Sequence, residues 1–297
     1  MPSLFSAPPS MARRTGLLAA AAALLSGCSG VRVLDTLVPH RGYTAETGIA
    51  YGSDPRQRLD VYRPEPAAGG PPPPLVVFFY GGSWSHGERA DYRFVGEALA
   101  AHGAVVVVAD YRLSPAVRYP AFVQDCALAL RWAADHAQAL GSDASRLVAM
   151  GHSAGAYNAA MLALDPRWLG AVGLSPDRLA AWIGLAGPYD FLPIGDPETR
   201  VAFAWPDTPA DSQPLAHASA RAPRTLLMAA ERDTLVDPRR NTGALAAKLR
   251  GLGVDVTLHE YTGVSHVTLM GSVATPLRWL APVHADLLAF LGLAQHG

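Results

Sequence analysis

The sequence has little cysteine and little charge, and each shortage excludes a class of protein. Its two cysteines, Cys28 and Cys126, stand far apart, which argues against a framework of disulfide bonds. Charged residues make up 16% of the chain and the formal net charge is −1, with no run rich in Lys or Arg. A nucleic-acid partner is therefore not expected. The sequence also lacks an internal repeat of fixed period, which argues against a solenoid.

Apolar residues, by contrast, fill half of the 297 positions. That proportion is ample for a large core and argues against a disordered chain. Chains of this length often fold as one α/β domain, so we expect one folded domain and a short N-terminal appendage. Cys126 lies in an apolar helical pattern and is expected to be a small buried hydrophobe rather than a reactive thiol.

Residues 1–27 are predicted to be a signal peptide of the lipoprotein type. Arg13-Arg14 is a basic start, and Gly16–Leu25 is an apolar run of signal-peptide length, too short for a comfortable membrane span. The run ends in Leu25-Ser26-Gly27-Cys28, which resembles the bacterial lipobox. This resemblance implies that processing leaves Cys28 as a lipidated N-terminus that anchors the protein to a membrane, followed by a tether over residues 28–41.

Two points stay open at this end of the chain. An ordinary secretory signal would be cleaved near Ser29-Gly30 and would leave no lipid. The first ten residues are unusual for a signal peptide, so translation could begin at Met11 instead of Met1. Under either alternative we expect export to the bacterial cell envelope, with residues 42–297 as the folded domain.

Short apolar runs alternate with helical patterns along that domain. The runs predicted as strands are Ile49–Tyr51, Leu59–Tyr62, Leu75–Tyr80, Ala104–Ala109, Arg146–Met150, Ala181–Leu185, Thr225–Ala230 and Val256–Tyr261. The predicted helices are Arg89–His102, Tyr119–Leu140, Ala154–Leu164, Pro238–Leu252 and Pro282–Leu291. Continuous apolar strands separated by helices indicate an α/β fold, with a mostly parallel sheet of about eight strands covered on both faces. The first two strands are expected to be antiparallel, and functional loops are expected at the carboxyl ends of the parallel ones.

The segment Gly151-His152-Ser153-Ala154-Gly155 follows a predicted strand and opens a predicted helix. Glycines two residues to either side of a serine, in a strand–turn–helix context, are typical of a nucleophile elbow. The elbow forces an unfavourable backbone at the serine and packs strand closely against helix, so bulkier residues at the glycine positions would clash. Ser153 is therefore the candidate nucleophile. The plainer alternative is a strand-to-helix turn with a capping serine.

Gly81 and Gly82 come directly after the predicted strand that ends at Tyr80. Because they lack side chains, their backbone N–H groups are uncovered and suited to hold the oxyanion of a tetrahedral intermediate. The N–H of Ala154, the residue after the serine, would be the paired contributor. A Gly-Gly pair is also what a simple tight turn uses, so its position relative to Ser153 carries this prediction.

Two further residues are predicted to line a substrate pocket. Trp84 lies in the same loop as the two glycines, and His152 precedes the candidate nucleophile. His86 lies nearby as well, and neither histidine has the spacing of a metal site, so no metal is expected.

A serine hydroxyl becomes a good nucleophile only when a base takes its proton and an acid orients that base. Behind an elbow of this kind, the chain order is serine, acid, histidine. His266 lies in the predicted loop just beyond the predicted strand Val256–Tyr261, at its carboxyl end, and is the preferred base. The other downstream histidines lie in a Pro/Ala-rich segment, a strand, a helix and the tail: His217, His259, His284 and His296.

Three acidic residues follow the predicted strand Thr225–Ala230. Asp233 lies early in the loop and is the preferred acid. Asp237 precedes Pro238 and is better placed to cap the next helix. Glu231 is kept as an alternative acid.

Together these motifs make the chain resemble the esterase and lipase branch of the α/β-hydrolases, near the hormone-sensitive-lipase-like carboxylesterases and the kynurenine-formamidase-like group. The similarity runs from about Gly48 to Leu291. The matching segments are Tyr80-Gly81-Gly82-Ser83-Trp84, Asp110–Pro115 with Tyr119-Pro120-Ala121 and Asp125, Gly151–Gly155, Glu231–Val236 and Gly263–His266. Tyr80 stands where the family has histidine. Ser83 and Trp84 follow the glycines where the lipase-like branch has a third glycine, which moves the chain toward formamidase-like and feruloyl-esterase-like members.

The resemblance implies hydrolysis of a small-molecule carboxylic ester by Ser153, His266 and Asp233 through an acyl-enzyme, with no cofactor. Residues 188–222 could supply a modest lid, and a small lid is expected to suit short to medium acyl groups. The same triad would serve an amidase such as an arylformamidase, or a peptidase. A different class of alternative is a surface-anchored binding lipoprotein with an inactive site, because fold alone does not imply function.

Overall fold

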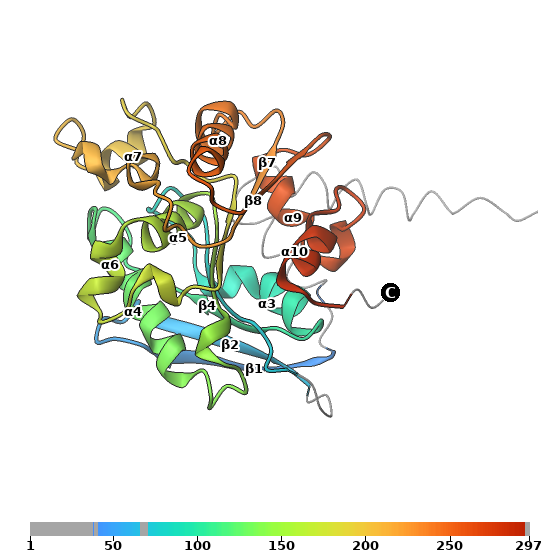
Figure 1. The fold of residues 1–297 in the computed structure, drawn as a ribbon. Helices are drawn as coiled ribbons and strands as arrows, with labels where there is room; N and C mark the ends of the chain where they lie inside the picture. The colour runs from blue at the N-terminus through green and yellow to red at the C-terminus, as the bar shows by residue number, and fades with distance from the viewer. Residues whose placement is uncertain (1–37, 39–40, 66–70, 295–297) are drawn as a thin grey trace, which may run out of the picture.

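The computed structural model describes residue 38 and residues 41–65 and 71–294 (Figure 1). The predicted signal peptide, the lipidation site Cys28 and most of the predicted tether lie outside the described residues. Within the described part, no helix is both long enough and apolar enough to cross a membrane.

The described strands form one eight-stranded sheet, which confirms the predicted α/β architecture. The strands are β1 (Tyr43–Ala50), β2 (Arg58–Pro64), β3 (Leu75–Phe79), β4 (Val105–Ala109), β5 (Leu147–His152), β6 (Ala181–Leu185), β7 (Thr225–Ala230) and β8 (Val256–Tyr261). Their order across the sheet is β1-β2-β4-β3-β5-β6-β7-β8. β2 is antiparallel to both of its neighbours, as expected at the start of the chain, and the other pairs are parallel.

The central parallel strands are buried along their whole length, because their residues are almost all apolar on both faces. Their register brings distant parts of the sequence together. Phe79, at the end of β3, pairs with Gly151 near the end of β5. The loop after β3 and the turn after β5 therefore leave the same edge of the sheet side by side.

β1 differs from its prediction, because it begins at Tyr43 and not at Ile49. It is an edge strand whose side chains are mostly exposed, so it carries little apolar signal in the sequence. A break in register after Glu46 contains Gly48, whose φ is 75° and whose N–H donates to Asp60 Oδ1 at 2.8 Å.

Helices cover both faces of the sheet (Figure 1). They are α3 (Arg93–Ala100), α4 (Ala121–His136), α5 (Ala154–Leu164), α6 (Pro166–Ala171), α7 (Pro197–Ala202), α8 (Ala244–Gly251), α9 (His266–Gly271) and α10 (Val283–Leu291). α3 and α10 lie together on one face, where His284 Nε2 is 2.9 Å from the carbonyl oxygen of Ala98. α4, α5 and α6 pack against one another on the other face. Cys126, on α4, is fully buried as expected.

Two predicted helices are shorter than expected and begin with other helical geometry. Arg89–Tyr92 is a 3₁₀ turn before α3, and Arg239–Gly243 is a π-helical turn before α8. The short helices α6, α7 and α9 were not predicted, because six residues are too few to show a helical period. The first two had a usable signal, since Asp165-Pro166 and Asp196-Pro197 are an N-cap residue followed by proline at the first helical position.

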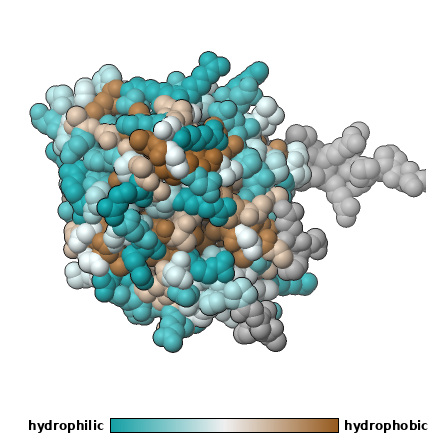
Figure 2. All heavy atoms as spheres, viewed as in Figure 1, coloured by the Kyte–Doolittle hydropathy of each residue, from teal (hydrophilic) through white to brown (hydrophobic). Residues whose placement is uncertain are grey.

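Residues 188–222, the predicted lid, leave β6 and contain α7 with two 3₁₀ turns. α7 and α8 lie at the top of the view in Figure 1. On the face drawn in Figure 2, hydrophilic residues surround smaller hydrophobic patches.

Candidate active site

Ser153 stands between the end of β5 and the start of α5. Its backbone has φ 52° and ψ −122°, a region that residues with a side chain rarely adopt. The neighbouring glycines allow strand and helix to meet there. A Cβ on Gly151 would lie 2.1 Å from the carbonyl oxygen of Gly155, and a Cβ on Gly155 would lie 2.0 Å from that of Phe79. The turn therefore has the strained geometry of an elbow, and the Ser153 side chain makes no helix-capping hydrogen bond.

His266 is the first residue of α9, whereas the sequence predicted a loop at this position. Ser265 caps this helix in a capping box with Thr268, and the cap fixes the direction in which the chain enters the helix. His266 Nδ1 lies 2.6 Å from Asp233 Oδ2, and both side chains are almost fully buried. The structure thus joins the predicted base, at the start of α9, to the predicted acid, in the loop after β7.

Both oxygens of the Asp233 carboxylate have hydrogen-bond partners. Its Oδ1 accepts hydrogen bonds from the N–H groups of Leu235 at 2.8 Å and Val236 at 3.0 Å. Burial by itself would raise the pKa of Asp233, but the hydrogen bond and charge of His266 and the two N–H groups lower it below its ordinary value. An ionised Asp233 fixes the proton of His266 on Nδ1 and leaves Nε2 to accept another.

The other two acidic residues after β7 are placed differently. Asp237 Oδ1 accepts hydrogen bonds from the N–H groups of Arg239 and Arg240, so it caps the next helical turn as predicted. Glu231 is exposed, and its N–H pairs with the carbonyl of Tyr261. The geometry therefore favours Asp233 over Glu231 as the partner of His266.

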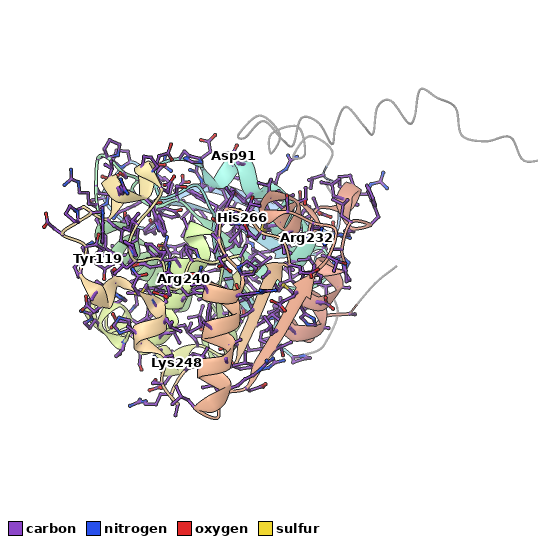
Figure 3. The ribbon with its side chains drawn as sticks, turned by 90° about the horizontal axis from the view of Figure 1, so that it is seen from above. Asp91, Tyr119, Arg232, Arg240, Lys248 and His266 are labelled. Atoms are coloured by element: carbon purple, nitrogen blue, oxygen red, sulfur yellow. The ribbon has the colours of Figure 1, made fainter. Side chains whose placement is uncertain are left out.

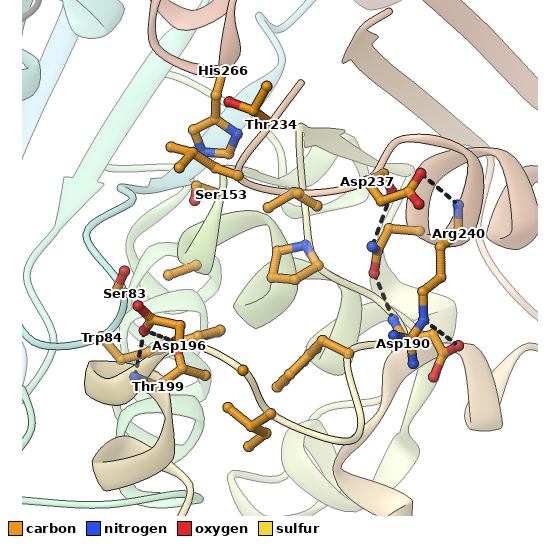
Figure 4. Close-up of a pocket in the computed structure, with 18 of the residues that line it drawn as sticks. Ser83, Trp84, Ser153, Asp190, Asp196, Thr199, Thr234, Asp237, Arg240 and His266 are labelled. Atoms are coloured by element: carbon orange, nitrogen blue, oxygen red, sulfur yellow. Dashed lines mark hydrogen bonds and ion pairs between the residues drawn. The ribbon is translucent and has the colours of Figure 1, made fainter. Parts of the chain in front are cut away.

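Ser153 and His266 line the same cavity, which has a volume of about 420 Å³ and opens at the carboxyl ends of the strands. Figure 4 shows the His266 ring next to Ser153 on one side of this cavity. Figure 3, seen from above, places His266 well inside this end of the molecule, with Arg240 near the start of the helix that carries Lys248.

Of the three predicted oxyanion donors, Ala154 lines the cavity beside Ser153, whereas Gly81 and Gly82 are not among the lining residues. A Cβ on Gly81 would lie only 3.0 Å from the Cβ of Ser153, so the loop backbone touches the nucleophile directly. Gly82 is the next residue, and its carbonyl accepts the N–H groups of Ser85 and His86 in a tight turn. Ala154 begins α5, where the first N–H groups have no partner inside the helix and carry the positive end of its dipole.

Only one of the two predicted pocket residues lines the cavity. Trp84 lines the cavity, although the residue is only 2% exposed and its Nε1 donates to Asn158 Oδ1 at 3.0 Å. His152 does not line it. Its side chain turns behind His266, where its Nε2 is 3.2 Å from the His266 carbonyl oxygen and the two rings are 5.0 Å apart. Because alternate residues of a strand point to opposite faces, a neighbour of the nucleophile need not share its cavity.

Burial and the nearby imidazole of His266 lower the pKa of His152 to about 3, so His152 is neutral at ordinary pH. A neutral ring with its proton on Nε2 donates to the carbonyl of His266 and supports that residue from behind. His152 therefore packs against the candidate base, and the prediction that it lines the substrate pocket is wrong.

The far wall of the cavity includes Asp190 and Phe191 from the predicted lid, together with Arg240 and Asn241, and none of these four residues was predicted individually. Arg240 Nε lies 3.1 Å from Asp190 Oδ2. Asn241 Oδ1 accepts the N–H groups of Tyr189 at 2.6 Å and Asp190 at 2.8 Å, which ties the predicted lid to the turn before α8. No local motif marks these residues, because they meet only through folding.

Among residues 38, 41–65 and 71–294, no group of three or more His, Cys, Asp or Glu side chains is placed to hold a metal ion. The cavity brings together a serine hydroxyl, an imidazole paired with a carboxylate, and the start of α5 with its backbone N–H groups. This set can activate a hydroxyl for attack on a carbonyl carbon.

Comparison with known proteins identifies a family for most of this fold. The family model described as BD-FAE matches residues 59–249, more than half of the chain. Esterase LipC of Mycobacterium tuberculosis is 29% identical over 246 residues, which is 76% of this chain and 60% of LipC. A probable isoprenylcysteine alpha-carbonyl methylesterase of Arabidopsis thaliana, ICMEL1, is 29% identical over 74% of this chain and 50% of its own length. The chain therefore spans about half to three fifths of these two curated relatives.

Solved structures share the fold. A bacterial heroin esterase superposes with a TM-score of 0.70 at 24% identity and covers 88% of each chain. Thermogutta terrifontis esterase 2, in a form phosphonylated by sarin, also has a TM-score of 0.70, at 23% identity, over 87% of this chain and 98% of its own.

Proposed function

Because the chain belongs to the BD-FAE family, we propose that it is a serine hydrolase that cleaves carboxylic esters with short to medium acyl groups. One observation carries the proposal: the imidazole of His266, tied at 2.6 Å to the carboxylate of Asp233, shares a cavity with the strained serine at residue 153. The names of the relatives LipC and ICMEL1, both esterases, agree with it.

In the proposed reaction, Ser153 Oγ attacks the ester carbonyl carbon while His266 Nε2 takes the hydroxyl proton. The negative charge that forms on the carbonyl oxygen is held by the N–H groups of Gly81, Gly82 and Ala154. The protonated His266, oriented by Asp233, then gives its proton to the leaving alcohol. Water then gives a proton to His266 as it attacks the acyl carbon, and the protonated His266 returns that proton to Ser153 Oγ as the acid leaves, which restores the serine hydroxyl and the neutral imidazole. These steps use no cofactor.

The size of the cavity supports a modest acyl group. Its volume of about 420 Å³ is near the lower end for small-molecule sites, and residues of the lid such as Phe191 and Ile194 line it. Structures of Thermogutta terrifontis esterase 2 hold propionate or butyrate. We infer the same range of acyl groups for this chain.

The proposal is tested with p-nitrophenyl esters of increasing acyl length, assayed beside a formanilide and a short peptide. Wild type should hydrolyse acetate or butyrate esters fastest, and Ser153→Ala should lose turnover. A fluorophosphonate probe should label the wild type and not Ser153→Ala. An unlabelled, inactive wild type would favour a binding protein with a dead site, and faster cleavage of the formanilide or the peptide would favour an amidase or peptidase.

We further propose that the protein is exported and anchored in the bacterial cell envelope through a lipid on Cys28. The support is the sequence alone: a basic start, an apolar run and Leu25-Ser26-Gly27-Cys28. When the full chain is made in a bacterium fed with labelled palmitate, wild type and Cys126→Ala should take up label, and Cys28→Ala should not. Mass spectrometry of the mature N-terminus decides the alternative, because ordinary secretion would leave an unlipidated start near Ser29-Gly30.

A further inference from the structure

The loop of residues 81–87, which carries two of the three proposed oxyanion donors, is strained. Ser83 has φ 48° and Trp84 has φ 57°, so two successive residues with side chains adopt the left-handed backbone region. Such conformations persist only where the surrounding structure fixes them. The contacts at the two ends of the loop show what fixes this one.

Tyr80, the residue before the loop, is fully buried and is held through both its side chain and its backbone. Its ring stacks on Tyr111 at 4.8 Å and on Tyr92 at 5.6 Å. Its carbonyl oxygen accepts a hydrogen bond from Tyr111 Oη at 2.8 Å. Its Oη donates to Asp110 Oδ1 at 2.9 Å and accepts from Arg56 Nη2 at 2.7 Å. Burial, together with the charge of Asp110, raises the pKa of Tyr80, so the hydroxyl keeps the proton that it donates.

The other end of the loop is bound to the same groups. Arg56 Nη2, which donates to Tyr80, also donates to the carbonyl oxygen of Gly87 at 2.9 Å. Asp110 Oδ1, which accepts from Tyr80, also accepts the N–H of Arg89 at 2.7 Å. Gly87 packs directly on the Tyr80 ring, since a Cβ there would lie 2.9 Å from two ring carbons.

We propose that Tyr80, Arg56 and Asp110 form a clamp that holds both ends of residues 81–87 and thereby positions the oxyanion donors. None of the three is among the residues that line the cavity, so they are positioning residues that act through the loop backbone. The Tyr80 hydroxyl is the centre of the clamp, because it accepts from the arginine and donates to the aspartate.

The functional part of this inference rests on the proposed ester hydrolysis. Gly81 touches Ser153, so a shift of the loop start moves the proposed donors relative to the reacting carbonyl. A misplacement of about 1 Å is enough to slow an enzyme by up to about 100-fold. The donors act mainly in the transition state, so loss of their position should lower kcat and leave KM nearly unchanged.

Tyr80→Phe tests the clamp, because it keeps the stacked ring and removes only the hydroxyl. Tyr261→Phe is a matched control: Tyr261 Oη donates to Asp286 Oδ2 at 2.7 Å, so this variant also loses one tyrosine–carboxylate hydrogen bond, away from the loop. Two quantities are measured for each: backbone hydrogen exchange over residues 81–87, and kcat and KM for p-nitrophenyl butyrate well below the melting temperature.

The clamp predicts that Tyr80→Phe raises exchange in residues 81–87 and lowers kcat by about 10- to 100-fold at similar KM, while Tyr261→Phe does neither. Unchanged exchange in the loop of Tyr80→Phe would overturn the clamp whether or not any ester is hydrolysed. Faster exchange with unchanged kcat would overturn its positioning role. A wild type that cleaves no ester would defeat the proposed function instead, and exchange would still decide whether the clamp exists.

Arg56→Lys is a second variant that leaves the core intact, because the Arg56 side chain is 36% exposed. A lysine keeps the charge but cannot span the Tyr80 hydroxyl, the Gly87 carbonyl and the Tyr111 carbonyl at once, as the guanidinium does. Arg56→Lys should therefore raise hydrogen exchange at the end of the loop near Gly87 and lower kcat, as Tyr80→Phe does. Wild-type exchange at that end in Arg56→Lys would contradict the role given to Arg56.

Discussion

The backbone of Ser153 predicts that exchanging this serine for glycine abolishes activity and makes the protein more stable. Its φ of 52° and ψ of −122° lie where a side chain is unfavourable and glycine is not. Ser153→Ala provides the comparison, because it removes the same hydroxyl and keeps a Cβ in the strained conformation. The two variants should be equally inactive and differ in stability.

The size of the difference follows from two opposing terms. A residue held in a sparsely populated backbone region costs of order 1–3 kcal/mol, which glycine would recover. Glycine loses more chain entropy on folding, which takes back about 0.5–1 kcal/mol. The net gain of Ser153→Gly over Ser153→Ala is therefore about 1 kcal/mol, with an upper bound of about 2.5 kcal/mol. For a domain of this size that corresponds to a rise in melting temperature of about 2–4 °C.

The assay is urea or thermal unfolding of wild type and both variants, with p-nitrophenyl butyrate turnover measured on the same samples. Ser145 serves as a control position, because it is exposed and lies in the 3₁₀ helix Ala144–Arg146 with ordinary backbone angles. There the order should reverse, with Ser145→Gly less stable than Ser145→Ala. If Ser153→Gly were no more stable than Ser153→Ala while the control behaved as expected, the serine would not be strained and the elbow argument would fail.

Three further predictions concern the groups around the site. Asp233→Asn should lower kcat by about 10⁴-fold, because the imidazole loses the partner that fixes its tautomer, whereas exposed Glu231→Gln should leave kcat within about twofold. Burial and the neighbouring imidazole lower the pKa of His152 to about 3, whereas its unfolded pKa is near 6.5. As the pH falls from 6.5 toward 3, the unfolded chain binds a proton at His152 and the folded protein does not, so the folded protein loses stability over this window. Between pH 7 and pH 5 the wild type should lose about 2 kcal/mol more unfolding free energy than His152→Gln, and equal losses in urea titrations would refute the assignment. Gly155→Ala should prevent folding, because its Cβ would lie 2.0 Å from the carbonyl oxygen of Phe79. Gly170 lies in helix α6 with open space around it, so Gly170→Ala should raise the free energy of unfolding by about 0.5–1 kcal/mol, measured by thermal unfolding.

Several parts of the site were visible in the sequence because local patterns determine them. The elbow at Ser153 needs glycines at fixed offsets between an apolar strand and a helix, and that pattern is contained in five consecutive residues. Asp233 and His266 could be chosen because each comes shortly after the end of a predicted strand, and parallel strands bring those ends to one edge of the sheet. The sequence did not reveal that His266 begins a helix, since six residues show no period.

Other parts depended on contacts that no local pattern contains. β1 has exposed side chains and is a strand only because it pairs with β2, so its first six residues were missed. His152 was expected in the pocket, yet the direction of its side chain and the position of His266 place it behind that residue. Arg240 and Asp190, which meet on the far wall of the cavity, come from segments with no shared motif.

By itself, the sequence determined the α/β class, the order along the chain of the loops that carry the candidate groups, and the identity of the candidate nucleophile, base and acid. These follow from which residues must be buried and which backbones require glycine, and both are properties of short segments. Only the tertiary structure decided how the other polar side chains pair: Arg56 with Tyr80, Arg240 with Asp190, and His152 with the backbone behind the base. The partner of a buried polar group is chosen by the fold, because such a group must find a hydrogen bond wherever the packing leaves one.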